Sequence, residues 1–231
     1  MSLPAVRRAS PPPSADRRLT VSLLPEPESE RELARLGIRW RGYTEAIARV
    51  DDLLPAGFPV CLRVLAGLQG EGDPDTVADE FLRRDRQALT RGILREMGME
   101  RVEPLIGDLA RPRLERLLDV LPGAPGGELF GHHWAGRDAT TVAVPLDRVI
   151  GGGRADLVEV AAGPVWWSPP STIWDVGGSW VMVSYTDSPS TYVGLTRAYP
   201  GLIEQLGLPA VCWAERSDRV DDWVAPLPGE R

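Results

Sequence analysis

Apolar residues in the first half of the chain recur mainly at helical spacing, which predicts several helices around one buried strand. Ser29 and Glu32 form a capping-box signature that opens a short helix, and Gly37 ends that helix. The continuous apolar run Phe58–Leu65 predicts the strand. Three further helices are expected at residues 43–54, 74–97 and 113–121.

Strand patterns begin after the last of these helices. Segments 129–134 and 140–146 predict a hairpin that is closed by the turn residues 135–138. The triple glycine at 151–153 is predicted to be a flexible joint.

Segment Trp180–Thr186 is the clearest strand of the chain. It carries apolar residues on both faces, which is typical of a central strand covered on at least one side by a helix. The turn residues Asp187–Ser190 follow, and the chain is expected to return antiparallel at residues 191–193. A helix at 200–206 with Gly207 as its C-cap, and a short strand at 210–214, complete the pattern.

The order of these elements predicts the fold class. Helices are expected mostly in the first half and a largely antiparallel sheet mainly in the second half, which is an α+β arrangement. Residues 1–18 lack periodicity and contain three consecutive prolines, so they are expected to be a disordered tail. Residues 19–231 are then expected to form a single α+β domain.

Charge is distributed unevenly along the chain. Residues 1–116 hold 19 Arg against 19 Asp and Glu, whereas residues 117–231 hold 7 Arg against 14 and carry the whole net charge of −7. An acidic surface repels a phosphate backbone, so nucleic-acid binding is not expected. A basic surface on a protein partner is compatible with this charge, and so is an acidic face that only keeps the protein in solution.

Two further features of composition bear on environment rather than on activity. All 26 basic residues are arginine, which a very GC-rich genome explains without a functional role. The chain has no apolar run of roughly eighteen residues that would cross a membrane, and the apolar run 19–24 is too short for a secretory signal. A cytoplasmic protein that does not bind membranes is expected, with Cys61 and Cys212 as buried thiols rather than a disulfide.

Sequence motifs for catalysis and for metal binding are missing from the chain. His132 and His133 are adjacent in a predicted strand, so they point to opposite faces and cannot converge on one metal ion or nucleophile. The segment Gly177–Val181 lacks the second glycine of a nucleophile elbow, and Gly151–Gly153 is not followed by a phosphate-binding sequence. No cofactor, metal site or catalytic residue is therefore assigned, and enzymatic activity is not indicated.

Tryptophan is the most informative residue type of the second half, which holds seven of the eight. A cluster of aromatic and polar residues within one short stretch can form a recognition surface for a partner. The candidate binding residues are Trp166, Trp167, Trp174, Trp180, Asp187, Thr191 and Tyr192. The alternative is that these tryptophans fill the core, and both interpretations stay open.

Three patches of sequence are similar to a family of uncharacterised proteins that are common in high-GC Gram-positive bacteria. The patches are the Trp-rich strand and S-T-Y-V-G turn within Ile173–Gly194 with the following L-I-E-Q-L, the L-P-A-G-F segment at 54–58, and the F-x-x-x-W-x-G pattern of Phe130, Trp134 and Gly136. Leu195 departs from the family, which usually has a second glycine there. The resemblance implies a single α+β unit and no particular substrate.

The sequence thus favours a non-enzymatic protein-binding module, of a toxin-neutralising or regulatory type. The missing catalytic signatures and the acidic, Trp-rich second half motivate this hypothesis. The alternative is a small-molecule-binding protein or enzyme with a pocket of carboxylate and aromatic side chains between sheet and helix. Oligomeric state cannot be read from the sequence.

Overall fold

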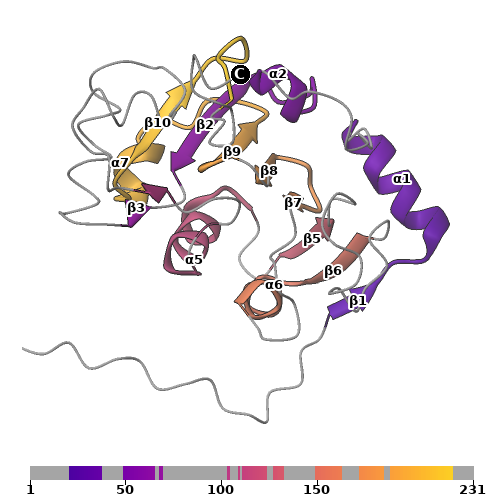
Figure 1. Cartoon of the computed structure of the whole chain (residues 1–231). Helices are drawn as coiled ribbons and strands as arrows, with labels where there is room; N and C mark the ends of the chain where they lie inside the picture. Colours follow the sequence, from indigo (N-terminus) through magenta and orange to yellow (C-terminus); the bar gives the residue numbers. More distant parts are fainter. Residues whose placement is uncertain are drawn as a thin grey trace, which may run out of the picture.

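An eight-stranded antiparallel sheet forms the centre of the molecule (Figure 1). The computed structural model describes residues 21–37, 49–65, 68–69, 103–104, 109, 111–123, 127–132, 149–162, 172–184 and 188–220. The strand order is β1-β6-β5-β7-β8-β9-β2-β10, and every neighbouring pair is antiparallel. The strands are β1 (Val21–Leu23), β2 (Val60–Leu65), β5 (Glu128–His132), β6 (Val149–Gly153), β7 (Thr172–Asp175), β8 (Trp180–Ser184), β9 (Ser190–Leu195) and β10 (Val211–Ala214).

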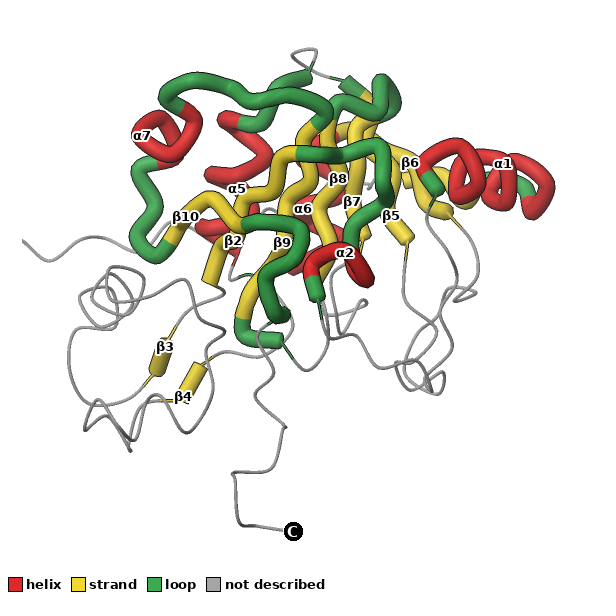
Figure 2. The backbone as a smooth tube through the Cα atoms, turned by 90° about the horizontal axis from the view of Figure 1, so that it is seen from above, coloured by secondary structure: helices red, strands yellow, loops and turns green. Residues whose placement is uncertain are grey.

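Helices pack on both faces of this sheet (Figure 2). One face, called the α5 face here, is covered by α5 (Arg111–Val120), α6 (Arg154–Ala162) and α7 (Leu202–Leu206). The opposite face, called the α2 face, contacts α1 (Glu26–Leu36) and α2 (Val50–Leu53). A separate ladder joins β3 (Leu68–Gln69) to β4 (Glu103–Pro104). The fold is therefore α+β, as the sequence predicts, and most strands of the main sheet come from the second half of the chain.

The pleat of the strands divides their residues between the two hydrophobic clusters. Leu62, Val64 and Val193 belong to the cluster on the α5 face, and Cys61 and Tyr192 to that on the α2 face. This alternation of buried residues explains why the central strands are apolar on both sides. A single cross-strand row on the α2 face runs through all eight strands: Ala214, Cys61, Gly194, Val181, Trp174, Phe130, Gly151 and Ser22.

Several predicted elements are confirmed by the structure. The buried strand at 58–65 is β2, although it starts at Val60, and the helix expected at 113–121 is α5. The predicted central strand is β8, with β9 returning antiparallel beside it. Helix α7 ends at Gly207 in the left-handed conformation, as its C-cap position requires, and the short final strand is β10.

The predicted start of α1 is wrong, because the helix begins at Glu26 rather than after Ser29. Pro27 in the first turn supplies the fixed φ that a helix start accepts. Ser29 is buried, and its Oγ accepts a hydrogen bond from Val149 N at 3.1 Å while lying 3.3 Å from Leu24 O. Its hydroxyl therefore joins α1 to β6 instead of capping the helix. The predicted end at Gly37 is correct.

Two other predictions are corrected. Of the helix expected at 43–54, residues 43–48 lie outside the described residues; the described part differs from the prediction at Arg49, which is extended and bridges Arg219, while Val50–Leu53 is helical. The triple glycine is not a flexible joint but part of β6, between β1 and β5. A Cβ atom on Gly151 would lie 3.0 Å from the Phe130 ring and 3.2 Å from Leu24 Cδ1, so glycine lets these side chains pack closely against β6.

Other sequence predictions lie outside the described residues. They are the tail at 1–18, the helix at 74–97, the turn at 135–138 and the strand at 140–146. Among the helices that the structure describes, none combines the length and apolar character needed to span a membrane.

Gly194 tests the close packing of the sheet against the segment before β2. A Cβ atom on Gly194 would lie 2.8 Å from Phe58 Cβ, an atom too near the backbone to move away. We therefore expect Gly194→Ala to lower the free energy of unfolding by about 1–3 kcal/mol, measured by urea unfolding.

Gly57→Ala is the matched control, because a Cβ atom there meets nothing within 4 Å. We expect this control to change stability by less than about 1 kcal/mol. Equal effects of the two substitutions would contradict the packing described for Gly194.

Candidate functional site

The candidate binding residues that the structure describes are all buried in the sheet. Trp174 and Trp180 are 0% and 2% exposed, and Thr191 and Tyr192 are also buried. Trp166, Trp167 and Asp187 lie outside the described residues. Trp174 and Trp180 therefore form no exposed platform, and the alternative interpretation, that tryptophans fill the core, holds for these two.

Trp174 and Trp180 also lie on opposite faces of the sheet. Trp180 belongs to the cluster on the α5 face, and its Nε1 donates to Pro122 O at 2.7 Å, which fastens the segment after α5 to β8. Trp174 belongs to the cluster on the α2 face, where its ring packs edge-on against the Phe130 ring with the two ring centroids 5.8 Å apart. Trp174 Nε1 has no hydrogen-bond partner within the described part of the chain. The two indoles are thus separate packing elements and do not converge on one site.

A buried polar row crosses the α2 face next to Trp174. The cross-strand register places Arg63, Tyr192, Thr172 and His132 in this row, with Val183 between Tyr192 and Thr172. Arg63 is 5% exposed and its Nε donates to Ser190 Oγ at 3.3 Å, while His132 is 3% exposed. The one sign of this polar row in the sequence is Arg63, a charged residue that interrupts the apolar run of its strand.

The two cysteines lie on neighbouring strands in different environments. Neither cysteine forms a disulfide; Cys61 is buried and Cys212 half-buried, so the prediction of a buried thiol holds fully for Cys61 only. Burial raises the pKa of Cys61 to about 12, although the positive charge of Arg216 opposes the shift. Cys61 is therefore a packing residue, and its thiolate is scarce at neutral pH.

Strand β10 presents the largest aromatic surface that the described residues expose. Trp213 is 36% exposed and lies on β10, which pairs with β2 on one side and ends the described sheet on the other. Leu23 on β1, at the opposite edge, is 39% exposed, and Val176 is exposed in the turn between β7 and β8. The sequence places Trp213 in its last predicted strand but gives no sign that this strand is an edge.

Arginine side chains hold both ends of β10. Before the strand, Arg113 Nη1 donates to Pro209 O at 2.8 Å and Arg116 Nε donates to Leu206 O at 2.7 Å. After it, the Arg216 guanidinium donates to the carbonyls of Leu54, Pro55 and Phe58 at 2.8–3.0 Å and pairs with Asp51. Charge-assisted hydrogen bonds of this kind are stronger than neutral ones, so they fix the edge strand in place.

A groove of about 250 Å³ between α5 and α6 is the other candidate site. Its lining residues are Arg111, Glu115, Asp119, Arg154, Ala155 and Val158. Arg111 pairs with Glu115 at 2.8 Å and Arg154 with Asp119 at 3.2 Å, so the charges of the groove largely neutralise one another. Burial lowers the pKa of Arg154, against the opposing effect of Asp119. No cluster of three or more metal-ligating side chains occurs within the described ranges.

Comparison with known proteins finds no match to this chain among protein-family models, curated proteins or solved structures. The resemblance to proteins of high-GC Gram-positive bacteria therefore stays a prediction. A functional hypothesis has to rest on the residues of the chain itself, and the exposed edge around Trp213 is the feature that offers one.

The two thiols should differ in reactivity. We expect native protein at pH 8 to react quickly at one thiol, Cys212, because Cys61 is buried and protonated there. Addition of urea should release the second thiol. Titration with a chromogenic disulfide reagent measures both steps, and Cys212→Ser should abolish the fast one. Fast reaction of both thiols in native protein would contradict the burial of Cys61.

Proposed function

We propose that this chain is a non-enzymatic protein-binding module, of a regulatory or toxin-neutralising type, that recognises its partner through the sheet edge around Trp213. The observation that carries this proposal is the exposure of Trp213 on an edge strand, while Trp174 and Trp180 are buried. Tryptophan is enriched among the few residues that dominate the binding energy of protein interfaces.

The two covered faces of the sheet support the choice of the edge. Strands β2, β9 and β8 bury side chains on both the α5 face and the α2 face, so these parts are not available to a protein partner. The edge strand β10 is still accessible, and the unpaired backbone groups of an edge strand can pair with a strand of another chain. Recognition at an edge also requires no catalytic group.

The rigidity of β10 supports the same proposal. The hydrogen bonds of Arg113 and Arg216 to backbone carbonyls hold the segments on either side of the strand. A binding strand that is already in its bound conformation loses little entropy when a partner docks. Arg113 and Arg216 therefore stabilise the proposed surface and do not themselves contact the partner.

The charge of the chain favours a basic partner. The net charge of −7 comes from residues 117–231, the half that contains β10. Complementary charge speeds the encounter with a basic surface and disfavours acidic competitors.

The alternative of a small-molecule site has less support. The groove between α5 and α6 is smaller than the usual range of ligand pockets, roughly 300–1,000 Å³, and its charged groups pair with each other.

Trp213→Ala should weaken capture of a partner from the native lysate at least about tenfold without changing the melting temperature by more than a few degrees. The reason is that the exposed indole contributes to binding more than to the core. Quantitative mass spectrometry of the captured proteins measures the loss, and titration calorimetry with the purified partner measures the affinity.

Leu23→Ala is the matched control, because Leu23 is equally exposed on the opposite edge strand. We expect it to retain partner binding within about twofold. Unchanged binding by Trp213→Ala, or an equal loss with Leu23→Ala, would refute the proposed recognition surface.

A further inference from the structure

We infer, on the basis of the proposed function, that the partner supplies an extended segment that adds to β10 as a further antiparallel strand and pairs with Trp213 through the backbone. Three features of β10 support this mode of recognition: the direction of its backbone groups, the position of Trp213 and the acidic residues beyond its two ends.

The register of β10 on β2 determines which backbone groups point outward. Leu65 and Ala210 lie opposite each other in this register, and Leu65 N donates to Ala210 O at 3.1 Å. In an antiparallel ladder, hydrogen-bonded and non-hydrogen-bonded pairs alternate. Cys212 and Ala214 therefore bond to β2, whereas the N–H and C=O groups of Val211 and Trp213 point away from it.

Trp213 is consequently the centre of the free edge. Among the backbone hydrogen bonds outside the ladders, none within the described residues involves Trp213. An added strand can exchange two hydrogen bonds with Trp213, and the partner residue in that pair then has its side chain on the same face as the indole. An apolar residue of the partner thus meets the exposed ring, which gives both affinity and register.

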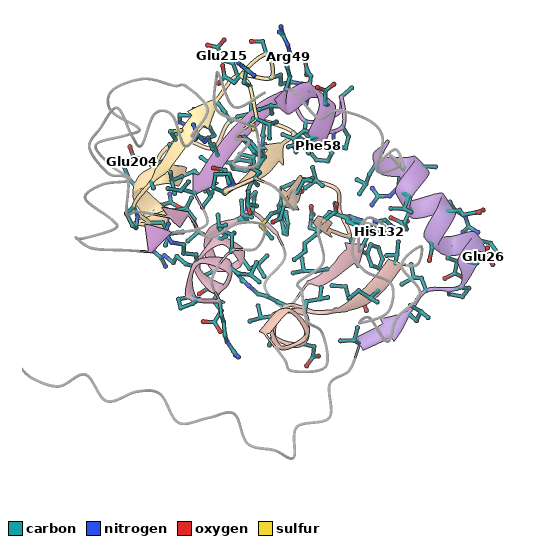
Figure 3. The ribbon with its side chains drawn as sticks, in the orientation of Figure 1. Glu26, Arg49, Phe58, His132, Glu204 and Glu215 are labelled. Atoms are coloured by element: carbon teal, nitrogen blue, oxygen red, sulfur yellow. The ribbon has the colours of Figure 1, made fainter. Side chains whose placement is uncertain are left out.

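Acidic side chains lie beyond both ends of β10. Glu204 on α7 and Glu215 directly after β10 are exposed, and Figure 3 shows them toward opposite ends of the strand. Three arginines around the ends of β10, Arg113, Arg116 and Arg216, direct their guanidinium groups to backbone carbonyls. Glu204 and Glu215 therefore place negative charge beyond the two ends of β10.

The occupant inferred from this geometry is a short extended segment flanked by basic residues. The four residues of β10 span about 13 Å, which matches a core of four or five residues in the partner. Residues with β-branched side chains suit the core, and arginine or lysine on either side suits Glu204 and Glu215.

Backbone-methylated peptides test strand addition directly. The probe is a fluorescein-labelled peptide of alternating Val and Thr flanked by two Arg at each end, and the readout is fluorescence anisotropy with the full-length protein. N–H groups of successive residues point to opposite edges of a strand, so the orientation that places Val beside Trp213 also directs the Val N–H groups to β10.

Methylation of the Val nitrogens should therefore weaken binding at least about tenfold, whereas the same number of methyl groups on the Thr nitrogens should leave it within about threefold. Equal effects of the two methylation patterns, or no detectable binding of the unmethylated peptide, would overturn strand addition.

Charge variants test the chemistry of the occupant. Glu204→Gln combined with Glu215→Gln should weaken binding of the Arg-flanked peptide at least about fivefold at low salt, with little effect at high salt. The control removes two exposed carboxylates from α1 by Glu26→Gln and Glu28→Gln, and it should bind like the unmodified protein. A peptide flanked by Glu that binds as tightly as the Arg-flanked one would refute the basic occupant.

The peptide experiments and the Trp213→Ala capture experiment test strand addition and the protein-binding function separately. Loss of the native partner with Trp213→Ala, together with equal binding of the two methylated peptides, would leave the protein-binding role in place and refute only strand addition.

Discussion

Burial of both faces of the antiparallel sheet is the constraint on which the rest of the structure depends. Successive side chains of a strand point to opposite faces, so a strand covered on both sides has to be apolar at nearly every position. β2, β8 and β9 follow this pattern, with Leu62 and Val193 facing α5 and Cys61 and Tyr192 on the opposite side. Their buried polar residues include Arg63, which donates a hydrogen bond to Ser190, and Thr191, which bonds to Ser184. Covering both faces leaves the edges as the part of the sheet that can meet a partner.

Several arginines have a structural role in this fold that the high arginine content of the sequence does not reveal. A GC-rich genome explains why every basic residue is arginine, but not where the guanidinium groups point. Arg113, Arg116 and Arg216 donate to backbone carbonyls around both ends of β10, and Arg63 is buried within the sheet. The planar guanidinium suits several carbonyls at once, which a lysine ammonium does less well. These bonds connect elements far apart in the chain and keep the edge strand in place.

Local sequence patterns predict some of the elements, and long-range pairing decides their roles. β1, α6 and β7 are not predicted from the sequence. The alternation in β8 and the glycine after α7 are local signals, and both predictions are confirmed. The insertion of β2 between β9 and β10 is not visible locally, because its partners lie more than a hundred residues away. For the same reason the sequence predicts a flexible joint at Gly151, although this glycine packs against Phe130 within β6. The sequence also leaves open whether Trp180 is in the core or on the surface, and the structure shows its indole buried and bonded to Pro122. Trp213 gains its importance only from its place at the edge.

Amide hydrogen exchange along β10 tests most directly whether this edge is open in the native protein. An open edge predicts alternation: the amides of Cys212 and Ala214 bond to β2 and exchange slowly, while those of Val211 and Trp213 exchange at rates close to those of exposed loops. Slow exchange at Trp213, equal to that at Cys212, would show that the outer side of β10 is already paired and would contradict an open edge.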